Sequence, residues 1–373
     1  MTVSGNTASA VKFEVLIKGT AIEPTDVMNI QVSLDLMQPG MCLLTLKNPQ
    51  NKFSSKFGPG DSVEIKIGGG TRRADDGSGS GDVESVFVGE LVGVEAAMRQ
   101  GGEPKIAIRA FDKMHRMLRG KKSKTYVKQS DQDIVSAIAG QHGLQADCGS
   151  SPKIVHEHVY QHAQDDLSFI RVRAARIGFS VWCEGTKLFF KAPDLGQDSG
   201  LEFSYEQQPK SGGGKDKLKS FSARVSNAGV MKKVTVRGWN PEKKEEIVGE
   251  AEAKPSKLGS KNAASSLGDF GEPGTFGCDE PIASVEEAKA LAQAKLDQAA
   301  MGYVTAQAVT MGNNKLKPGI VIKIKTNFDD ASDPYNGKYL VAGVTHHYSS
   351  DNKGGEGGYE CNLNLCRDAT GGS

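Results

Sequence analysis

Two stretches of this chain repeat one order of turns and strands, and this repeat constrains the fold more than any other feature of the sequence. Residues 317–368 begin with the turn Pro318-Gly319, and residues 59–112 begin with Pro59-Gly60. In each stretch a basic alternating strand, a strand containing Gly-Val and an alternating strand that ends in aspartate follow the turn. We predict one small β unit used twice. The alternative is a pair of unrelated β-meanders that share turn chemistry and alternation.

The composition is typical of a globular protein with several domains. The chain has 373 residues, of which 24% are charged and 38% hydrophobic, and a length of this size suits two or three domains. The net charge of +1 gives no bulk attraction to nucleic acid or to an acidic membrane surface. No apolar run approaches the ~20 residues that span a bilayer, and we predict no membrane span. The first residues lack a basic start and an apolar core, so we predict no signal peptide.

The six cysteines indicate a reducing place of synthesis. None of them forms a Cys-x-x-Cys pair, which argues against a zinc ribbon or a thioredoxin-type site. Several lie within strand-like runs, where a free cysteine behaves as a small buried apolar residue. We expect synthesis in the cytoplasm.

The order of strand-like and helix-like patterns predicts a mainly β fold with α+β insertions, in which two similar small β-barrels flank an α+β middle domain. Residues 1–118 form the first barrel and residues 119–215 the α+β domain. The second barrel is split into residues 216–240 and 303–373, because residues 241–302 read as an insertion with one helix. The alternation of apolar and polar residues on the barrel strands predicts one buried and one exposed face.

Three helices have recognisable starts. Ser130 and Asp133 begin one helix, acids at residues 165–166 begin a second, and Ser284 with Glu287 forms a capping box for the third. The inner face of the third helix is mostly alanine, so a neighbour must approach it closely or hold it only lightly. That face carries Val285, Ala288, Ala292, Leu296 and Ala299.

No group of residues predicts catalysis, and the sequence yields no catalytic, cofactor-binding or metal-binding set. His156, His158 and His162 cluster, and strand alternation places the first two on one face, but no carboxylate or cysteine has a matching spacing for a metal. Asp165-Asp166 could be an acid pair, yet a helix start explains acids there. His346-His347 would point to opposite faces of a strand. Nucleophile, zinc-protease and phosphate-loop motifs are absent from the sequence.

One stretch and several later landmarks resemble a known family. The pattern consists of Tyr160-Gln161, Asp166-Leu167, Phe169 and Gly178, followed by a hairpin, and the later landmarks include Pro318-Gly319 and Gly343. In this order they resemble the hub proteins of contractile tails, namely the phage late control protein D family and the N-terminal hub part of VgrG spike proteins. The likeness covers nearly the whole chain. It departs from the family at Gln164-Asp165, where many relatives carry Glu-Ser, and in a loosely matched arginine.

The resemblance implies a structural baseplate hub without enzymatic activity or cofactor. Such a hub is a homotrimer in which two barrels per chain give a ring of pseudo-six-fold symmetry. One face would bind the inner tube or a tube initiator and the other the spike, with a tape measure or cargo passing through. The chain ends soon after its final strand, so we expect the spike to be a separate polypeptide. The particle would be a virion baseplate or an extracellular tail-like particle made in a bacterial cytoplasm.

Two other functions remain open at the level of sequence. The first is a cell-wall hydrolase associated with such a particle, which would need an acid pair or nucleophile in a cleft. The second is a surface or carbohydrate-binding module built on the paired barrels. The chain has only two tryptophans, Trp182 and Trp239, and this speaks against stacking on sugars.

Overall fold

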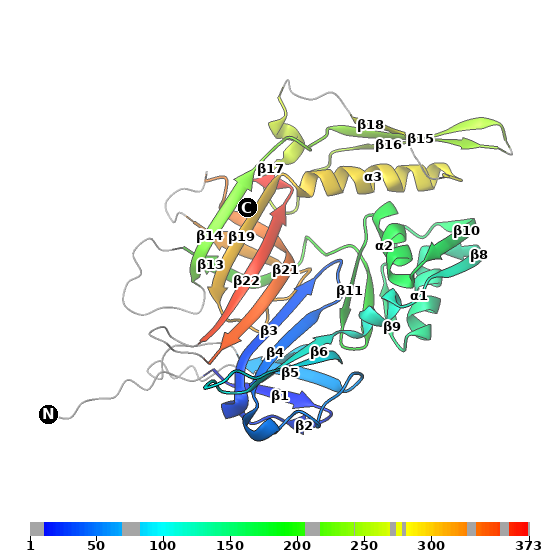
Figure 1. The fold of residues 1–373 in the computed structure, drawn as a ribbon. Helices are drawn as coiled ribbons and strands as arrows, with labels where there is room; N and C mark the ends of the chain where they lie inside the picture. Colours follow the sequence, from blue (N-terminus) through cyan, green and yellow to red (C-terminus); the bar gives the residue numbers. More distant parts are fainter. Residues whose placement is uncertain are drawn as a thin grey trace.

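The structure of the chain is a computed structural model, shown as a ribbon in Figure 1. It describes residues 11–68, 83–205, 217–241, 243–268, 274–277, 281–326, 333–350 and 358–371. The fold is mainly β, as the sequence predicts, and the long strands of one large sheet run through both halves of the chain. No helix in these ranges is long and apolar enough to cross a membrane.

The first barrel contains consecutive strands from the N-terminal part of the chain. Its neighbours follow the order β3-β4-β7-β6-β5-β1, and the short β2 extends the edge at β1. No ladder joins β3 to β1 within the described ranges, so this barrel is open at that seam. The strands are β1 (Phe13–Ile17), β2 (Thr20–Ala21), β3 (Val27–Asp35), β4 (Met41–Lys47), β5 (Ser62–Gly68), β6 (Val83–Ala97) and β7 (Lys105–Phe111), with short helical turns η1 (Pro24–Asp26) and η2 (Pro49–Asn51).

The second barrel is assembled from two distant parts of the chain. Its order is β14-β19-β22-β21-β20-β13, and an isolated bridge between Ser204 and Lys217 joins the two ends. The strands are β13 (Asp198–Ser204), β14 (Leu218–Val225), β19 (Val304–Met311), β20 (Val321–Lys325), β21 (Gly337–Ser349) and β22 (Gly358–Arg367).

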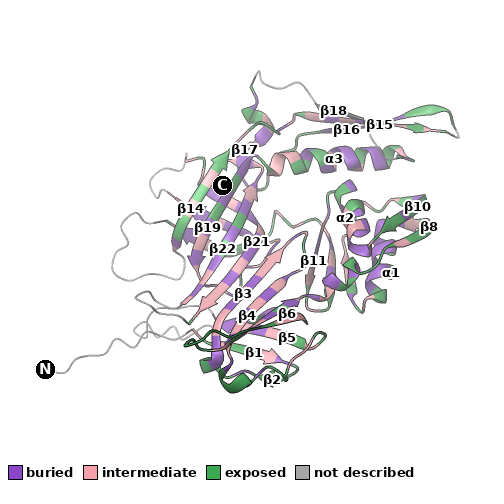
Figure 2. Ribbon diagram, in the orientation of Figure 1, coloured by how far each residue is buried: buried purple, intermediate pink, exposed green. Residues whose placement is uncertain are grey.

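The two barrels share one sheet and one core. Strand β3 pairs antiparallel with β21, so the sheet continues from the first barrel into the second. A single cluster of buried side chains contains residues of both, among them Ile30 and Val344 from the two joined strands. Buried residues alternate with less buried ones along these strands, as Figure 2 shows in purple, pink and green.

The barrels have the same topology. Strands β1, β3, β4, β5, β6 and β7 correspond in chain order and in sheet order to β13, β14, β19, β20, β21 and β22. The repeat therefore covers six strands, three more than the sequence comparison used. One pairing differs, because β1 is antiparallel to β5 whereas β13 is parallel to β20.

Irregularities of the ladders repeat as well. The register between β6 and β7 shifts between Leu91 and Gly93, and the register between β21 and β22 shifts between Val341 and Gly343. A bulge bends a strand and raises its twist. Its recurrence at equivalent positions means that the two barrels share local curvature as well as strand order.

A second register shift recurs in the β3–β4 ladder of the first barrel and in the β14–β19 ladder of the second. It lies between Val27 and Asn29 on β3, and between Leu218 and Ser220 on β14. Counting along the ladders from these points aligns β3 with β14 residue by residue. Asn29 is thereby equivalent to Ser220.

The equivalence corrects one detail of the sequence comparison, in which Asp112 and Asp368 end the two units. Ala110 pairs with Leu91 as Leu365 pairs with Val341, so Asp112 is equivalent to Arg367 and not to Asp368. Both are buried. The units therefore end in side chains of opposite charge, and each hydrogen-bonds to backbone: Asp112 accepts from the N–H of Gly40, and Arg367 donates to the carbonyl of Asn336.

The α+β part lies to the side of the first barrel, at the right of Figure 1. A two-stranded ribbon and a three-stranded sheet enclose its own hydrophobic core with the helices. Its elements are η3 (Lys113–Leu118), β8 (Lys122–Ser130), α1 (Asp131–Gln141), β9 (Gln145–Cys148), β10 (Val155–Gln164), α2 (Asp166–Arg176), β11 (Ser180–Glu184) and β12 (Lys187–Lys191).

The insertion forms a third small unit, with α3 lying along a three-stranded sheet at the top of Figure 1. Its elements are β15 (Lys233–Asn240), β16 (Glu245–Glu252), β17 (Lys261–Asn262), η4 (Ala263–Ser266), β18 (Gly274–Gly277) and α3 (Val285–Met301), and β17 pairs with the last strand β23 (Ala369–Thr370). Two strands lie outside their predicted groups. Strand β15 pairs with β16 and β18 and not within the second barrel, and β13 belongs to that barrel and not to the α+β part.

The alanine face of α3 has the close neighbour that the sequence requires. Gly249 on β16 lies so near the helix that an added Cβ would be 2.3 Å from the carbonyl carbon of Ala288. Both residues are buried. The small residues on the two elements therefore allow backbone-to-backbone packing, since a larger side chain on either would separate them.

Candidate functional site

The Gln161 and Asp166 of the family pattern form the centre of a buried polar network. The amide of Gln161 donates to Asp166 Oδ1 over 3.0 Å, and its oxygen accepts from the hydroxyl of Tyr126 over 3.3 Å. Asp166 Oδ2 lies 2.6 Å from Lys122 Nζ and 2.7 Å from His142 Nε2. Burial alone would raise the pKa of Asp166, but these hydrogen bonds hold it below its usual value.

The other residues of that pattern divide between core and surface. Leu167 and Phe169 are buried in the core of the α+β part, and Gly178 has the left-handed φ of 71° that ends α2. Tyr160 points outward instead and is 51% exposed. Of the pattern's members in the α+β part, Tyr160 and Gly178 are exposed and the others are buried.

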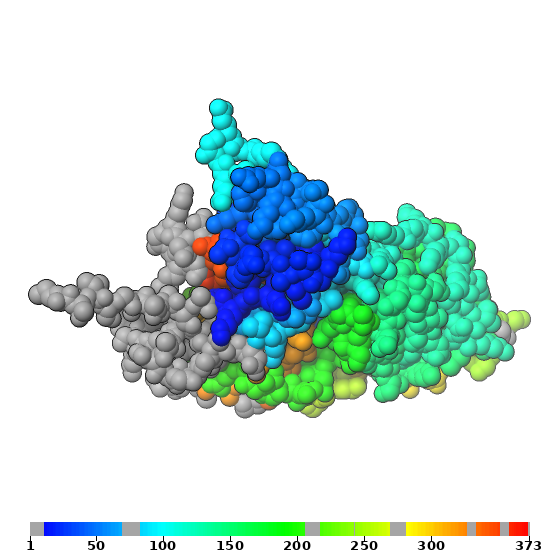
Figure 3. Space-filling view, turned by 90° about the horizontal axis from the view of Figure 1, so that it is seen from below, coloured from blue at the N-terminus to red at the C-terminus, as the bar shows by residue number. Residues whose placement is uncertain are grey.

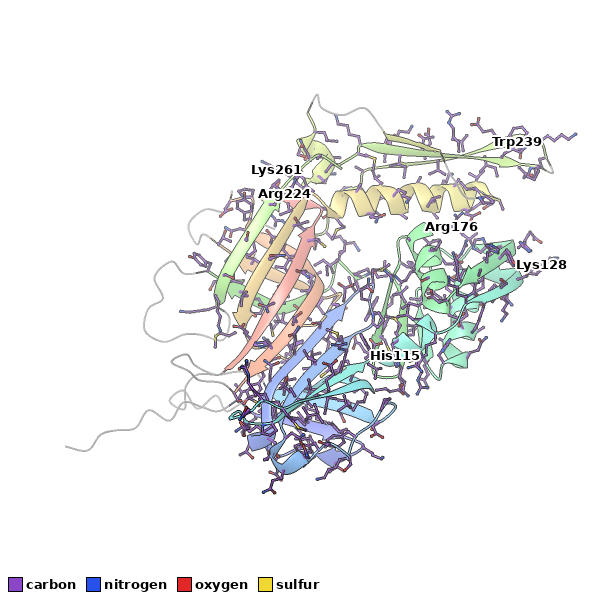
Figure 4. The ribbon with its side chains drawn as sticks, viewed as in Figure 1. His115, Lys128, Arg176, Arg224, Trp239 and Lys261 are labelled. Atoms are coloured by element: carbon purple, nitrogen blue, oxygen red, sulfur yellow. The ribbon has the colours of Figure 1, made fainter. Side chains whose placement is uncertain are left out.

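The three histidines His156, His158 and His162 do not form a common site. His156 is buried, whereas His158 and His162 are exposed. The prediction that His156 and His158 share a face stays a prediction: the two pair with Gln129 and Val127 of β8 and differ in burial, and Lys128 between those partners has a φ of 53° (Figure 4). No group of three potential metal ligands occurs in the described ranges.

His156 instead belongs to a buried ionic network. Its Nε2 lies 3.1 Å from Asp131 Oδ2 and 2.8 Å from Arg173 Nη2. Arg173 also donates through Nε to Asp131 Oδ1 over 2.6 Å. Burial would raise the pKa of Asp131, but hydrogen bonds from His156 and Arg173 lower it below the usual value. Helices α1 and α2 and strand β10 are held together by these charges.

The same network extends to the insertion through Glu287. Arg176 Nη2 donates to Glu287 Oε1 over 2.8 Å, and His156 Nδ1 lies 3.8 Å from that oxygen. The second oxygen of Glu287 accepts from the backbone N–H of Ala283 while Ser284 caps the helix. Figure 4 places Arg176 at the side of α2 that faces α3. One glutamate therefore starts α3 and joins it to the α+β part.

The barrel members of the pattern have structural roles that repeat in the first barrel. Gly319, after Pro318, has a φ of 88°, and its N–H donates to Val341 O over 2.8 Å. Gly60 has a φ of 95° and donates to Leu91 O over 2.7 Å. Each turn needs glycine for its positive φ.

Gly343 lies where β21 bulges and first meets β3. An added Cβ there would be 3.2 Å from Asp35 Oδ2 and 3.3 Å from Leu34 O. The glycine therefore permits the close approach of the two barrels at the start of their shared ladder.

One buried cysteine and histidine lie together but cannot act as a nucleophile pair. Cys361 Sγ is 3.4 Å from His346 Nδ1, and the hydroxyl of Tyr359 is 2.7 Å from the same nitrogen. Burial raises the pKa of Cys361 to about 12 and lowers that of His346 to about 4. A thiolate with an imidazolium is the reactive pair in such catalysis, and this environment opposes both charges. His347 points to the other side, as predicted, and contacts Asn29.

The predicted alternative of an acid pair at Asp165-Asp166 fails for a similar reason. Asp165 caps α2 by accepting from the N–H of Ser168 over 2.8 Å, while Asp166 is buried in its own ion pairs. Both carboxylates therefore have structural partners within the α+β part.

A groove of about 650 Å³ lies beside the junction of the barrels. Asp112, which follows the lining residue Phe111, is buried; burial raises its pKa to about 7, and it accepts from the N–H of Gly40 over 2.6 Å. Figure 4 labels His115 at this place, between barrel and α+β part. The groove is lined by Ser33, Leu34, Asp35, Gln38, Pro39, Met41, Val92, Phe111, His115, Leu118, Arg119, Val344, Thr345 and Asn364.

Sequence reasoning missed the ionic network and the joining of the barrels. Arg173, Arg176 and Asp131 are 17 to 111 positions from their partners, so no local spacing reveals them. The one available signal was arginine on the inner side of α2, where an amphipathic helix would carry apolar residues.

Comparisons with known proteins give one family and one fold. The model of a family described as the Alg8 N-terminal domain matches residues 7–350. Curated protein sequences contain no match.

Three solved structures of similar fold are tail or secretion proteins. The 43 kDa tail protein of prophage MuSo2 from Shewanella oneidensis has a TM-score of 0.66 at 12% identity, covering 96% of this chain and 99% of that one. A tail protein from Neisseria meningitidis has a TM-score of 0.68 at 10% identity, over 97% and 98%.

The third is an Escherichia coli component of the type VI secretion system described as similar to bacteriophage tail proteins. Its TM-score is 0.59 at 13% identity, over 95% of this chain and 76% of that one. Identities this low establish the fold alone. The chain thus has the tail-protein fold that the sequence resemblance implied, while the narrower expectation of late control protein D stays a prediction.

Proposed function

The chain belongs to the Alg8 N-terminal domain family, and from this premise and the tail-protein fold we propose that it is a structural subunit of a contractile-tail or injection-machine baseplate. Its specific role is that of the hub, a homotrimer between the inner tube and the central spike. The observation that carries the proposal is the identity of strand order between the two barrels.

Two equivalent barrels in one sheet provide a physical basis for that role. A closed ring of three chains contains six barrels with similar faces, because oligomers of one chain adopt cyclic symmetry. Such a ring offers near-six-fold contacts to a tube and three-fold contacts to a spike. The repeated bulges support this equivalence, since they give the six units the same curvature.

The proposed role is non-enzymatic and needs no cofactor. Each candidate for chemistry that the sequence offered has a structural explanation: Asp165 caps a helix, and Cys361 is buried with its pKa raised to about 12. We place the protein in a virion baseplate or an extracellular tail-like particle, where a tape measure or cargo would pass through the ring.

The domain division is part of the proposal. We infer two barrel domains, an α+β domain over about residues 113–197 and an insertion that includes β15 to α3. Each has its own cluster of buried apolar residues or shares the barrel core.

The proposal is tested by the oligomeric mass of the purified chain and by the proteins that it binds. Mass photometry is expected to give three times the 39.7 kDa of one chain, and electron microscopy of the particle a ring between tube and spike. Co-expression with tube and spike proteins of the same particle should yield a ternary complex. A chain that remains monomeric and binds neither partner contradicts the proposal.

The hydrolase and carbohydrate-binding alternatives make different predictions. Peptidoglycan cleavage that is lost on changing one exposed acidic residue would support the hydrolase. Trp182 stacks on Phe189 with ring centroids 4.8 Å apart, so Trp239, 59% exposed on β15, is the tryptophan that could contact a sugar (Figure 4). Glycan binding lost in Trp239→Ala would support the binding module.

A further inference from the structure

The junction between the two barrels is a template for contacts between chains. Residues 29–35 of β3 pair antiparallel with residues 343–349 of β21, from Asp35 opposite Gly343 to Asn29 opposite Ser349. Strand β20 pairs with the beginning of β21, at residues 337–340. Strand β22 pairs with one edge of β21, while β20 and then β3 pair with successive parts of the other edge.

Both partners of this junction have a counterpart at a free edge. The counterpart of residues 343–349 is residues 93–99, the end of β6 and the two residues after it, because Gly93 and Gly343 follow equivalent bulges. There β5 pairs only with residues 83–90. The counterpart of β3 is β14, whose outer edge carries no partner beyond the bridge at Lys217. Within the described ranges, no strand pairs with either of these two edges.

We propose that residues 220–226 of one copy pair antiparallel with residues 93–99 of the next copy, in the register of the internal β3–β21 junction. This inference rests on the proposed ring and names the surface that builds it. Exposed edges of this kind are templates for strand addition. The contact is head-to-tail, so successive copies repeat it until the ring closes.

Charge complementarity supports the register. In the internal junction Ser33 and Thr345 lie opposite each other, with their hydroxyls 3.1 Å apart. Their counterparts are Arg224 and Glu95, which are opposite in charge and both exposed. A shift by one residue would send these side chains to opposite faces of the sheet. Figure 4 places Arg224 on β14, at the outer side of the second barrel.

The apolar residues along the two edges match in the same way. Met98 is 65% exposed and Val225 36% exposed. In the proposed register Met98 lies opposite Phe221, as Tyr348 lies opposite the fully buried Ile30 in the internal junction. Figure 3 shows the end of the β6–β7 hairpin, in cyan, projecting from the body of the molecule. Positions that face a partner strand in the internal junction thus have exposed counterparts, Met98 among them, on the edges that a second copy would cover.

A charge exchange tests the contact. Glu95→Arg and Arg224→Glu, each alone, are expected to raise the concentration for half-association by roughly tenfold or more. The double variant should return it to near that of the parent chain, because the pair is restored with reversed polarity. Lys289→Glu, an exposed change on α3, is the matched control and should leave association unchanged. Circular dichroism identifies any variant that does not fold.

Oxidative cross-linking tests the register independently of charge. A chain with Ala96→Cys and Ala223→Cys should form covalent dimers and trimers on non-reducing gels. The parent chain with its own six cysteines, and the pair Ala96→Cys with Ser220→Cys, should give only background. If the chain forms a trimer in which all charge variants associate normally and the Ala96–Ala223 pair does not cross-link, this interface is overturned and the hub proposal stands. A chain that stays monomeric and binds no tube or spike protein overturns both.

Discussion

Arg176 donates a hydrogen bond to Glu287 over 2.8 Å, although the two residues are 111 positions apart. Both side chains are buried, and the bond joins the end of α2 to the start of α3. Because an unpaired buried charge is costly, this contact fixes how the insertion lies on the α+β part.

Removing either partner should therefore destabilise the protein. Arg176→Ala or Glu287→Ala leaves one buried charge without its partner, and we expect a loss of about 3–5 kcal/mol in the free energy of unfolding, measured in urea. The double change Arg176→Met with Glu287→Leu should cost less than either single change. Lys289→Ala, exposed on α3, is the control. Losses below about 1 kcal/mol in both single variants would contradict a structural role for the pair.

The close approach of β16 to α3 gives a second prediction. In Gly249→Ala the new methyl would be 2.3 Å from the carbonyl carbon of Ala288, so the strand or helix must move. We expect a loss of at least about 1–3 kcal/mol, which is the usual cost of overpacking. Gly140→Ala is the matched control, because that position in α1 has open space and alanine favours helix by about 1 kcal/mol. Equal stability of the two variants would refute the packing argument.

Two adjacent residues of the family pattern, Tyr160 and Gln161, should differ in how much their substitution lowers the stability of the protein. Gln161→Ala removes a donor to Asp166 and an acceptor for Tyr126, and leaving buried groups unsatisfied should cost about 1–3 kcal/mol. Tyr160→Ser, at an exposed position, should change stability by no more than about 0.5 kcal/mol. Thermal and urea unfolding measure both. A larger loss for Tyr160→Ser than for Gln161→Ala would mean that the pattern is not held together by this network.

The sequence predicted the elements whose causes are local. Ser130 caps α1, Ser284 caps α3, and the turn at Gly319 has the positive φ that glycine provides. Strand order in the repeat was also predictable, because turn chemistry and alternation mark each strand.

What the sequence could not reveal depends on distant partners. The pairing of β3 with β21 joins residues more than 300 positions apart, and no periodicity specifies it. Strand β15 alternates like a barrel strand, yet it pairs with β16 and β18, because alternation gives a strand's faces and not its neighbours. The partners of His156, Asp131 and Arg173, lie on α1 and α2, so the spacing of the histidines could not reveal the network that His156 joins.

Acid should unfold this protein in part through His346. Its imidazole is fully buried between the hydroxyl of Tyr359 and the carbonyl of Leu316, and burial lowers its pKa from 6.5 to about 4. The unfolded chain binds a proton at higher pH than the folded chain does. Stability from this group is therefore complete above pH 6.5 and is lost as the pH falls toward 4, by up to about 1.4 kcal/mol per pH unit.

Urea unfolding of the parent chain and of His346→Gln between pH 7 and 4 measures this contribution. The glutamine variant is expected to be less stable at neutral pH, and its stability should decline less steeply on acidification because no imidazole is left to protonate at this site. His347→Gln is the matched control, because it makes the same change of side chain at a partly exposed position on the other face of β21. The same pH slope in the parent and in His346→Gln would show that His346 is not the group that titrates.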